Sequence, residues 1–106
     1  MVTKWYAWTK EVYDKLREGH DGTTPFPDLT TCEFEGESRA LHSIDEFAEI
    51  ACGWLLDEEY DGRPDGAPKE FVIHTVESEK TRTEAFSVDP YESTCISFNT
   101  YSIPLE

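Results

Sequence analysis

The last third of the chain follows a period of two, which constrains the fold more than any other feature of the sequence. From Lys69 onward, apolar and polar residues alternate over the segments EFVIHTVE, TEAFSVD and STCISFNTYSI. Successive side chains of a β-strand point to opposite faces of a sheet, so this alternation predicts three strands with one buried face. The stretches ESEKTR and PYE are predicted to form the turns between them, and Pro104 ends the last strand. The buried face is expected to consist largely of Phe71, Ile73, Phe86, Val88, Ile96 and Phe98.

A helix is predicted over residues 44–58. Ser43 followed three residues later by Glu46 is a capping box, and Asp45 adds negative charge to the first turn, where the helix dipole favours it. The apolar residues that follow have the spacing of one helix face: Ile44, Phe47, Ala48, Ala51, Trp54 and Leu55. Gly53 lies inside this helix, at a cost of about 1 kcal/mol relative to alanine.

The first part of the chain allows two interpretations. Over residues 3–18, TKWYAWTKEVYDKLRE, one helical stripe is formed by Trp5, Trp8, Val12 and Leu16. This spacing favours a helix capped by Thr3 at its start and by Gly19 at its end. The alternative is a short strand over KWYAWT, because tryptophan and tyrosine are common in strands.

The segment around residues 30–42, TTCEFEGESRALH, is predicted to form a β-hairpin. Cys32 and Phe34 alternate with glutamates as in a strand, Gly36 breaks the run, and residues 39–41 form the returning strand. Loops are predicted on either side of this hairpin and the following helix, because residues 19–29 and 57–68 are rich in glycine and proline.

Together these segments predict a single α+β domain over residues 1–106. The expected order of elements is α-ββ-α-βββ, with two amphipathic helices packed on one face of a small antiparallel sheet. Phe26 and Leu29 are expected to anchor the first loop as buried apolar side chains.

The chain is strongly acidic. Its 106 residues include 23 aspartates and glutamates against 9 lysines and arginines, which gives a formal net charge of -14. Three tryptophans, five tyrosines and six phenylalanines are too many for a disordered acidic tail, so the acids are expected on the surface of a folded domain. Such a surface repels phosphate backbones and anionic membranes and attracts basic proteins. A need for solubility, or adaptation to high salt, would also account for the acidity.

The cysteines and the N-terminus indicate a cytoplasmic protein. Cys32, Cys52 and Cys95 are odd in number and form no CxxC, which argues against a disulfide framework and against a zinc site. The opening MVTKWYAWTK lacks the apolar stretch of a signal peptide, and no apolar run is long enough to span a membrane.

Neither catalysis nor a cofactor is indicated. The sequence contains no GxSxG, HExxH, P-loop or GxGxxG pattern. His20, His42 and His74 are scattered over a loop, a helix entrance and a strand, where satisfied structural histidines are expected. The acids between residues 57 and 65 supply oxygen ligands but do not follow the calcium-loop pattern. We therefore expect a protein that is not an enzyme and holds no metal or cofactor.

The N-terminal segment is the one locally basic part of the chain. It contains four of the nine cationic residues: Lys4, Lys10, Lys15 and Arg17. Because Glu11, Asp14 and Glu18 lie among them, an amphipathic helix with internal ion pairs is predicted rather than a nucleic-acid-binding surface.

The functional hypothesis depends on the arrangement of the acids. In CEFEGE, residues 32–37, alternate glutamates would share one face of a strand about 6.8 Å apart. This is close to the axial advance of two nucleotides on one strand of B-DNA. The predicted helix adds acids at both ends, and those at its C-terminal end oppose the helix dipole. The expected partner-binding residues are Glu33, Glu35, Glu37, Asp45, Glu46, Glu49, Asp57, Glu58 and Glu59.

In size, acidity and lack of catalytic motifs, the chain resembles the small phage-encoded inhibitors of CRISPR and restriction systems. The resemblance lies in composition rather than in a residue motif, and it implies an anti-CRISPR-like protein of a phage or mobile element. The first hypothesis is therefore a non-enzymatic acidic protein that inhibits a nucleic-acid-binding protein by engaging its basic site, as a nucleic-acid mimic does.

The aromatic residues support a second hypothesis. A regulatory or accessory interaction module would contact its partner, or a second copy in a homodimer, through an aromatic patch of Trp5, Tyr6, Trp8 and Tyr13. Its acidity would then serve solubility alone. A third hypothesis, an enzyme of a different kind, would require a deep pocket in which a histidine lies beside a cysteine or a carboxylate.

Overall fold

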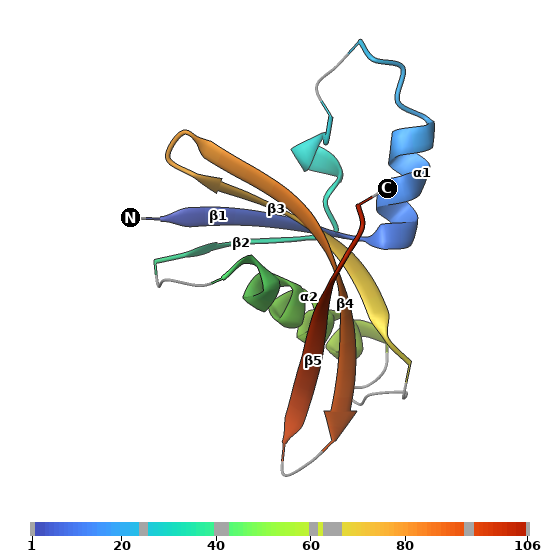
Figure 1. Ribbon diagram of the computed structural model, residues 1–106, viewed down its shortest axis with the longest axis vertical. Helices are drawn as coiled ribbons and strands as arrows, with labels where there is room; N and C mark the ends of the chain where they lie inside the picture. Colours follow the sequence, from blue (N-terminus) through green and yellow to red (C-terminus); the bar gives the residue numbers. More distant parts are fainter. Residues whose placement is uncertain are drawn as a thin grey trace.

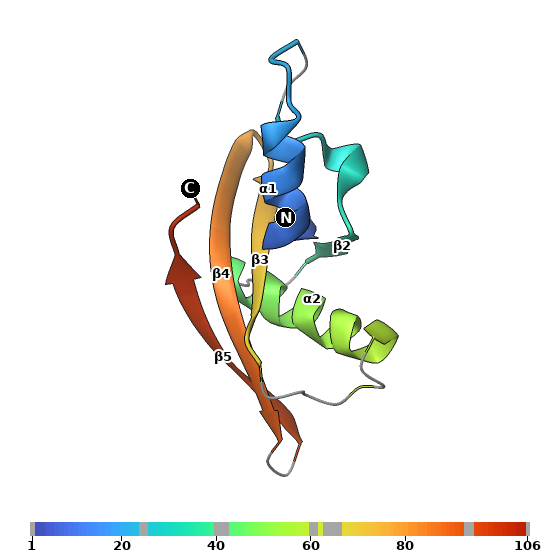
Figure 2. The same cartoon turned by 90° about the vertical axis from the view of Figure 1, so that its right-hand side faces the viewer.

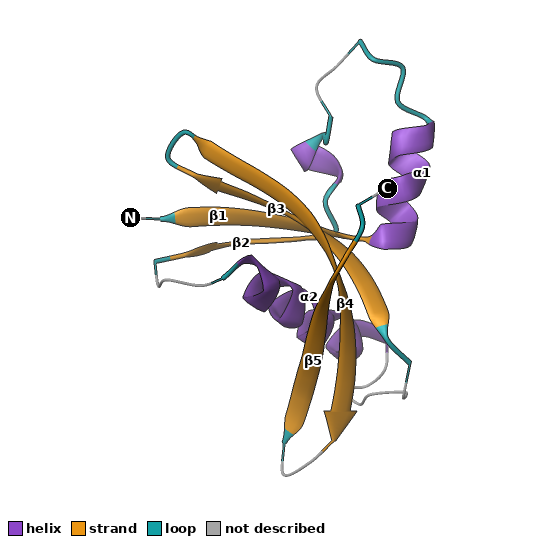
Figure 3. Cartoon of the chain, viewed as in Figure 1, coloured by secondary structure: helices purple, strands orange, loops and turns teal. Residues whose placement is uncertain are grey.

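The computed structural model describes residues 2–23, 26–39, 43–59, 62, 67–92 and 95–105. Within these ranges the elements are β1 (Thr3–Thr9), α1 (Lys10–Glu18), a 3-10 helix (Leu29–Thr31), β2 (Phe34–Ser38), α2 (Ile44–Glu59), β3 (Lys69–Glu77), β4 (Lys80–Glu92) and β5 (Ile96–Ile103). The five strands form one sheet in the order β2-β1-β3-β4-β5, and each neighbouring pair is antiparallel (Figures 1 and 3). The predicted α+β class, with helices packed on an antiparallel sheet, is confirmed.

The C-terminal meander has the three predicted strands but differs from the prediction in its turns and in the burial of β5. β3 ends at Glu77 and β4 begins at Lys80, so the first turn is shorter than ESEKTR, and Ile96 and Phe98 of β5 are only partly buried. Phe71, Ile73, Phe86 and Val88 are buried on one face of β3 and β4. Pro90 does not form a turn, since β4 continues to Glu92 and pairs Pro90 with Phe98. Its ring is fully buried on the same face as Val88, and this burial outweighs the turn preference of proline.

Residues 3–9 form a strand, so the predicted helix over residues 3–18 is wrong in its first half. β1 lies between β2 and β3, and both faces of the strand are covered. Trp5 packs on one face with the residues beneath α2, whereas Trp8 packs on the other face with those beneath α1. Their three-residue spacing therefore does not mark one side of a helix. α1 itself begins after Thr9 and is capped by Gly19, as expected for its end.

β2 pairs with β1, and the predicted break at Gly36 is wrong because the strand continues through that residue. Residues 40 and 41 of the predicted second arm, residues 39–41, lie outside the described residues. Gly36 is needed because the Trp5 indole crosses directly over it. A Cβ atom at Gly36 would lie 2.8 Å from Trp5 Nε1 and 3.0 Å from Trp5 Cε2. Gly36 thus permits a close approach instead of breaking the strand.

The two helices cover opposite faces of the sheet, so the prediction that they share a face is wrong. α2 packs on Trp5, Ala7, Phe71 and Ile73, whereas the intervening positions Trp8 and Val72 pack with α1. In Figure 1 the strands cross nearly edge-on, with α1 above the crossing and α2 below it. The reason lies in β1 and β3, whose apolar residues occupy consecutive positions, so both faces require cover.

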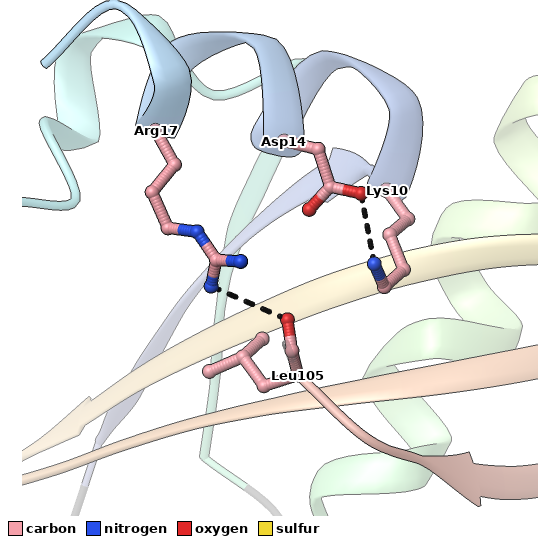
Figure 4. Close-up of polar contacts among 4 residues, drawn as sticks. All are labelled: Lys10, Asp14, Arg17 and Leu105. Atoms are coloured by element: carbon pink, nitrogen blue, oxygen red, sulfur yellow. Dashed lines mark hydrogen bonds and ion pairs between the residues drawn. The ribbon is translucent and has the colours of Figure 1, made fainter.

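One polar contact ties α1 to the C-terminal residues, and another lies within the helix. Arg17 Nη1 donates a hydrogen bond to the Leu105 carbonyl oxygen at 3.4 Å, and Lys10 Nζ lies 2.8 Å from Asp14 Oδ2 (Figure 4). Ile103 and Leu105 pack against the apolar cluster beneath α1, and so do Phe26 and Leu29, the expected loop anchors. The C-terminal residues and the first loop therefore close this face together with the helix.

Gly36→Ala is expected to lower the free energy of unfolding by about 1–3 kcal/mol, the usual cost of overpacking. The added methyl group would force the Trp5 indole to move, although this side chain is only 3% exposed and is stacked on Phe47 with ring centroids 5.5 Å apart. Denaturant unfolding of both proteins measures the difference.

Gly53→Ala is the matched control. The nearest atom to its new Cβ is Phe98 Cζ at 3.9 Å, an ordinary contact. Since alanine is the better helix former, a gain of about 0.5–1 kcal/mol is expected. Equal stability of Gly36→Ala and the wild type would contradict the close approach of Trp5.

Candidate functional site

The strongest concentration of negative charge belongs to α2. This helix contains six carboxylates and neither lysine, arginine nor histidine: Asp45, Glu46, Glu49, Asp57, Glu58 and Glu59. The predicted helix is confirmed, and its first turn is tied by the Glu46 N–H donating to the Ser43 carbonyl oxygen at 3.1 Å. Because the buried side of α2 is apolar, its acids are confined to the part that faces solvent and β5.

Four of these carboxylates line a groove between α2 and β5, which we call the α2–β5 groove. It has a volume of about 750 Å³ and is lined by Asp45, Glu46, Glu49 and Asp57 together with apolar residues of both elements. Those apolar residues include Ile50 and Trp54 from α2 and Ile96 and Phe98 from β5. We call these four carboxylates the rim of the groove and its apolar residues the floor. A groove lined by both kinds of side chain suits a ligand that is both basic and partly apolar.

The groove is held in shape from both sides. Trp54 is 42% exposed, yet its ring lies 5.2 Å from the Trp5 ring and 6.3 Å from the Phe34 ring. On the rim, the Thr100 hydroxyl of β5 donates a hydrogen bond to Glu49 Oε2 at 2.7 Å. The floor is thus an extension of the core, and one rim carboxylate is fixed to the neighbouring strand.

Glu33 has a structural role that its sequence position does not reveal. Its Oε1 accepts hydrogen bonds from the Thr9 N–H at 2.7 Å and from the Thr9 hydroxyl at 2.8 Å. Thr9 is the residue that precedes α1, so this carboxylate supplies negative charge at the start of that helix. Glu33 and Glu59 line a second cavity of about 640 Å³, together with residues of α1, β3 and β4.

Glu35 and Glu37 lie on the face of β2 opposite to Phe34, which points toward α2. Their neighbours on β1 are Tyr6 and Lys4, and Glu37 Oε1 is 4.0 Å from Lys4 Nζ. The structure therefore does not gather the nine predicted residues into one stripe. Four line the α2–β5 groove, Glu58 and Glu59 extend the charge at the end of α2, Glu33 lies near that end, and Glu35 and Glu37 face away.

The aromatic residues proposed as an alternative contact patch belong to the core. Trp5, Trp8 and Tyr13 are buried, and only Tyr6 is half-buried. The large apolar side chains exposed in the described parts of the chain are instead Trp54, Tyr91 and Tyr101. Sequence periodicity assigned Trp54 to the core stripe of its helix, and no local signal indicated its exposure.

The cations of α1 are engaged within the protein. Lys10 pairs with Asp14, Lys15 Nζ lies 3.2 Å from Glu11 Oε1, and Arg17 binds the Leu105 carbonyl oxygen. The Lys10–Asp14 and Lys15–Glu11 contacts match the predicted amphipathic helix with internal ion pairs.

Two side chains outside α2, Cys32 and His74, have pKa values displaced by burial. Burial, with the Glu35 carboxylate beside it, raises the pKa of the Cys32 thiol, so the reactive thiolate is disfavoured. Burial lowers the pKa of His74, whose Nδ1 shares a 2.7 Å hydrogen bond with the Thr83 hydroxyl.

No three histidine, cysteine or acidic side chains among the described residues are arranged to hold a metal ion. The acidic loop that could supply calcium ligands falls largely outside these residues.

Comparison of the chain with protein-family models, with curated proteins and with solved structures found no match. The helices described are too short or too polar to cross a bilayer.

His74 is expected to make stability depend on pH in a defined direction. Since its pKa is lower in the folded protein, the unfolded chain binds a proton first as the pH falls below about 6.5, and stability declines. The unfolding free energy of the wild type should therefore fall relative to that of His74→Gln between pH 7.5 and pH 5.5. A constant difference across this interval would contradict the burial of a neutral imidazole.

The carboxylates at the end of α2 are expected to lower stability. Glu58→Gln with Glu59→Gln should raise the free energy of unfolding by about 0.3–1 kcal/mol per carboxylate at low salt, because anions oppose the dipole at a helix C-terminus. Asp45→Asn, at the other end of the same helix, should have the opposite effect. Both differences should shrink in high salt, and chemical denaturation at two salt concentrations measures them.

Proposed function

We propose that this protein is a non-enzymatic acidic binding protein that engages a basic site on a nucleic-acid-binding protein and thereby inhibits it. The observation that supports the proposal most directly is α2, with six carboxylates, no basic residue and an acidic groove along one side. Proteins that bind nucleic acid have basic surfaces, and basic surfaces attract a concentration of negative charge such as that of α2.

The spacing of the acids supports a partial mimicry of nucleic acid. Asp45 and Glu49 are one helical turn apart, about 6 Å along the axis. Two nucleotides advance by about 6.8 Å on one strand of B-DNA. Because Glu35 and Glu37 face away from α2, the mimicry is limited to the α2 side of the molecule. The net charge of -14 would speed the encounter with a basic partner by electrostatic steering.

The energetic cost of this arrangement also supports a functional use. Asp57, Glu58 and Glu59 lie at the end of α2 where the helix dipole opposes anions, whereas Asp45 and Glu46 lie at its start, where the dipole favours them. Solubility alone would be served equally by acids placed elsewhere on the surface. Three acids at the unfavourable end of the helix are expected where a basic partner compensates for their cost to stability.

A displacement assay tests the proposal. Purified nucleic-acid-binding enzymes, namely a CRISPR effector and a restriction endonuclease, are loaded with a fluorescent duplex, and the protein is titrated in. We expect the wild type to release the duplex, with an effect that weakens as salt increases. Asp45→Lys with Asp57→Lys should abolish the release, because both residues lie on the groove rim.

Glu18→Lys with Glu79→Lys is the matched control. These exposed acids lie outside the groove, and the double substitution changes the net charge by the same amount. It should retain most of the displacement activity. Equal loss in both variants would show that only total charge matters, and absence of displacement by the wild type from both enzymes would contradict the proposed inhibition of these classes.

A further inference from the structure

The two edges of the sheet differ in their protection against pairing with another strand. β2 has only five residues, and two of them, Glu35 and Glu37, are charged. A short strand and charged side chains are both usual ways of protecting a sheet edge. β5 has eight residues, ISFNTYSI, with neither a charge nor a proline among them. In Figure 2, β5 is the outermost strand, and no described segment lies beyond it. Its outer N–H and C=O groups are therefore available to an added strand.

The α2–β5 groove lies directly beside this edge. Ile96 and Phe98 of β5 line the groove, and Thr100 on the same face bonds to Glu49 on its rim. A strand added to β5 would direct every second side chain toward that face, with a spacing of about 6.8 Å. Those side chains would enter the groove among Asp45, Glu49 and Asp57.

The chemistry of the groove specifies what those side chains are. Its rim is acidic and its floor is apolar, so lysine or arginine side chains would place their aliphatic stems on the floor and their charges at the rim. The half-exposed Trp54 ring offers a face for a cation. On the opposite face, β5 presents Asn99 and Tyr101, and Tyr101 is 60% exposed. Neither side chain is charged, so this face suits uncharged residues at the positions of the added strand that alternate with the basic ones.

We propose that β5 is the docking edge for an extended segment of the partner with basic residues at every second position. The segment adds to the sheet as a sixth strand and places its basic side chains in the α2–β5 groove. A second copy of this chain is the poorer occupant, because each copy has a net charge of -14 and pairing would bring two acidic grooves together. This inference rests on the proposed function and names the form of its partner.

A synthetic peptide tests the docking mode on the wild-type protein. The probe has the length of β5, with lysine at every second position and threonine or valine between. In a strand, the N–H groups of alternate residues point to the same edge. Methylating the lysine nitrogens of the backbone therefore blocks one edge of the peptide, and methylating the intervening residues blocks the other. All three peptides have the same charge.

We expect the unmodified peptide to bind, and one methylated form to bind about tenfold more weakly than the other because it loses its backbone hydrogen bonds to β5. The amide NMR signals of β5 should shift on binding. Asp45→Lys with Asp57→Lys should abolish binding, and Glu18→Lys with Glu79→Lys should not.

Equal binding of all three peptides would overturn the inference, since charge alone would then account for the contact. If the protein still displaced the duplex in that case, the proposed function would stand without the strand pairing. Failure of both the peptides and the displacement assay would overturn both. A stable dimer in sedimentation that the peptide does not dissociate would show β5 occupied by a second copy, and would also overturn it.

Discussion

The contact between the Trp5 indole and the backbone of Gly36 holds this protein together at the junction of three elements. Trp5 belongs to β1, Gly36 to β2, and the stacked Phe47 ring to α2. Because Gly36 lacks a side chain, the indole can lie flat across the edge strand and still reach the helix. The approach therefore joins β1, β2 and α2 at one point, and α2 is the element that contains the six carboxylates.

The same aromatic cluster connects the core to the surface. Trp54 packs on Trp5 and Phe34 from one side and lines the α2–β5 groove on the other. An exposed tryptophan on a loop would lose its rotamer freedom on binding a partner, which costs free energy. Trp54 is instead held by ring contacts with Trp5 and Phe34, which restrict its rotamers before a partner binds. Rigidity of this kind lowers the entropic cost of association.

The distribution of acids combines structural and surface roles that composition alone cannot separate. Glu33 stabilises the start of α1, and Glu49 is bonded to Thr100, so neither acts only as a solvated charge. Glu58 and Glu59 oppose the dipole of their own helix instead. The acids of this protein therefore differ in their effect on stability. Some contribute to the fold, whereas those at the end of α2 lower its stability.

Local sequence patterns determined the meander and α2, because both depend on periodicity within a single segment: alternation from Phe71 to Phe98, and helical spacing after Ser43. They also determined that the chain is acidic and that α2 has acids at both of its ends. Only the tertiary structure decided the role of residues 3–9, since the spacing of Trp5 and Trp8 fits a helix until β2 and β3 pair on either side. It likewise decided that Gly36 continues a strand, that the helices cover opposite faces, and that Glu35 and Glu37 face away from α2.

The groove arises where β5 passes beside α2, two segments about 50 residues apart that are joined by the Thr100–Glu49 hydrogen bond. A contact between distant segments leaves no periodic pattern in either of them, which is the physical reason that the acids could be predicted and the site they form could not.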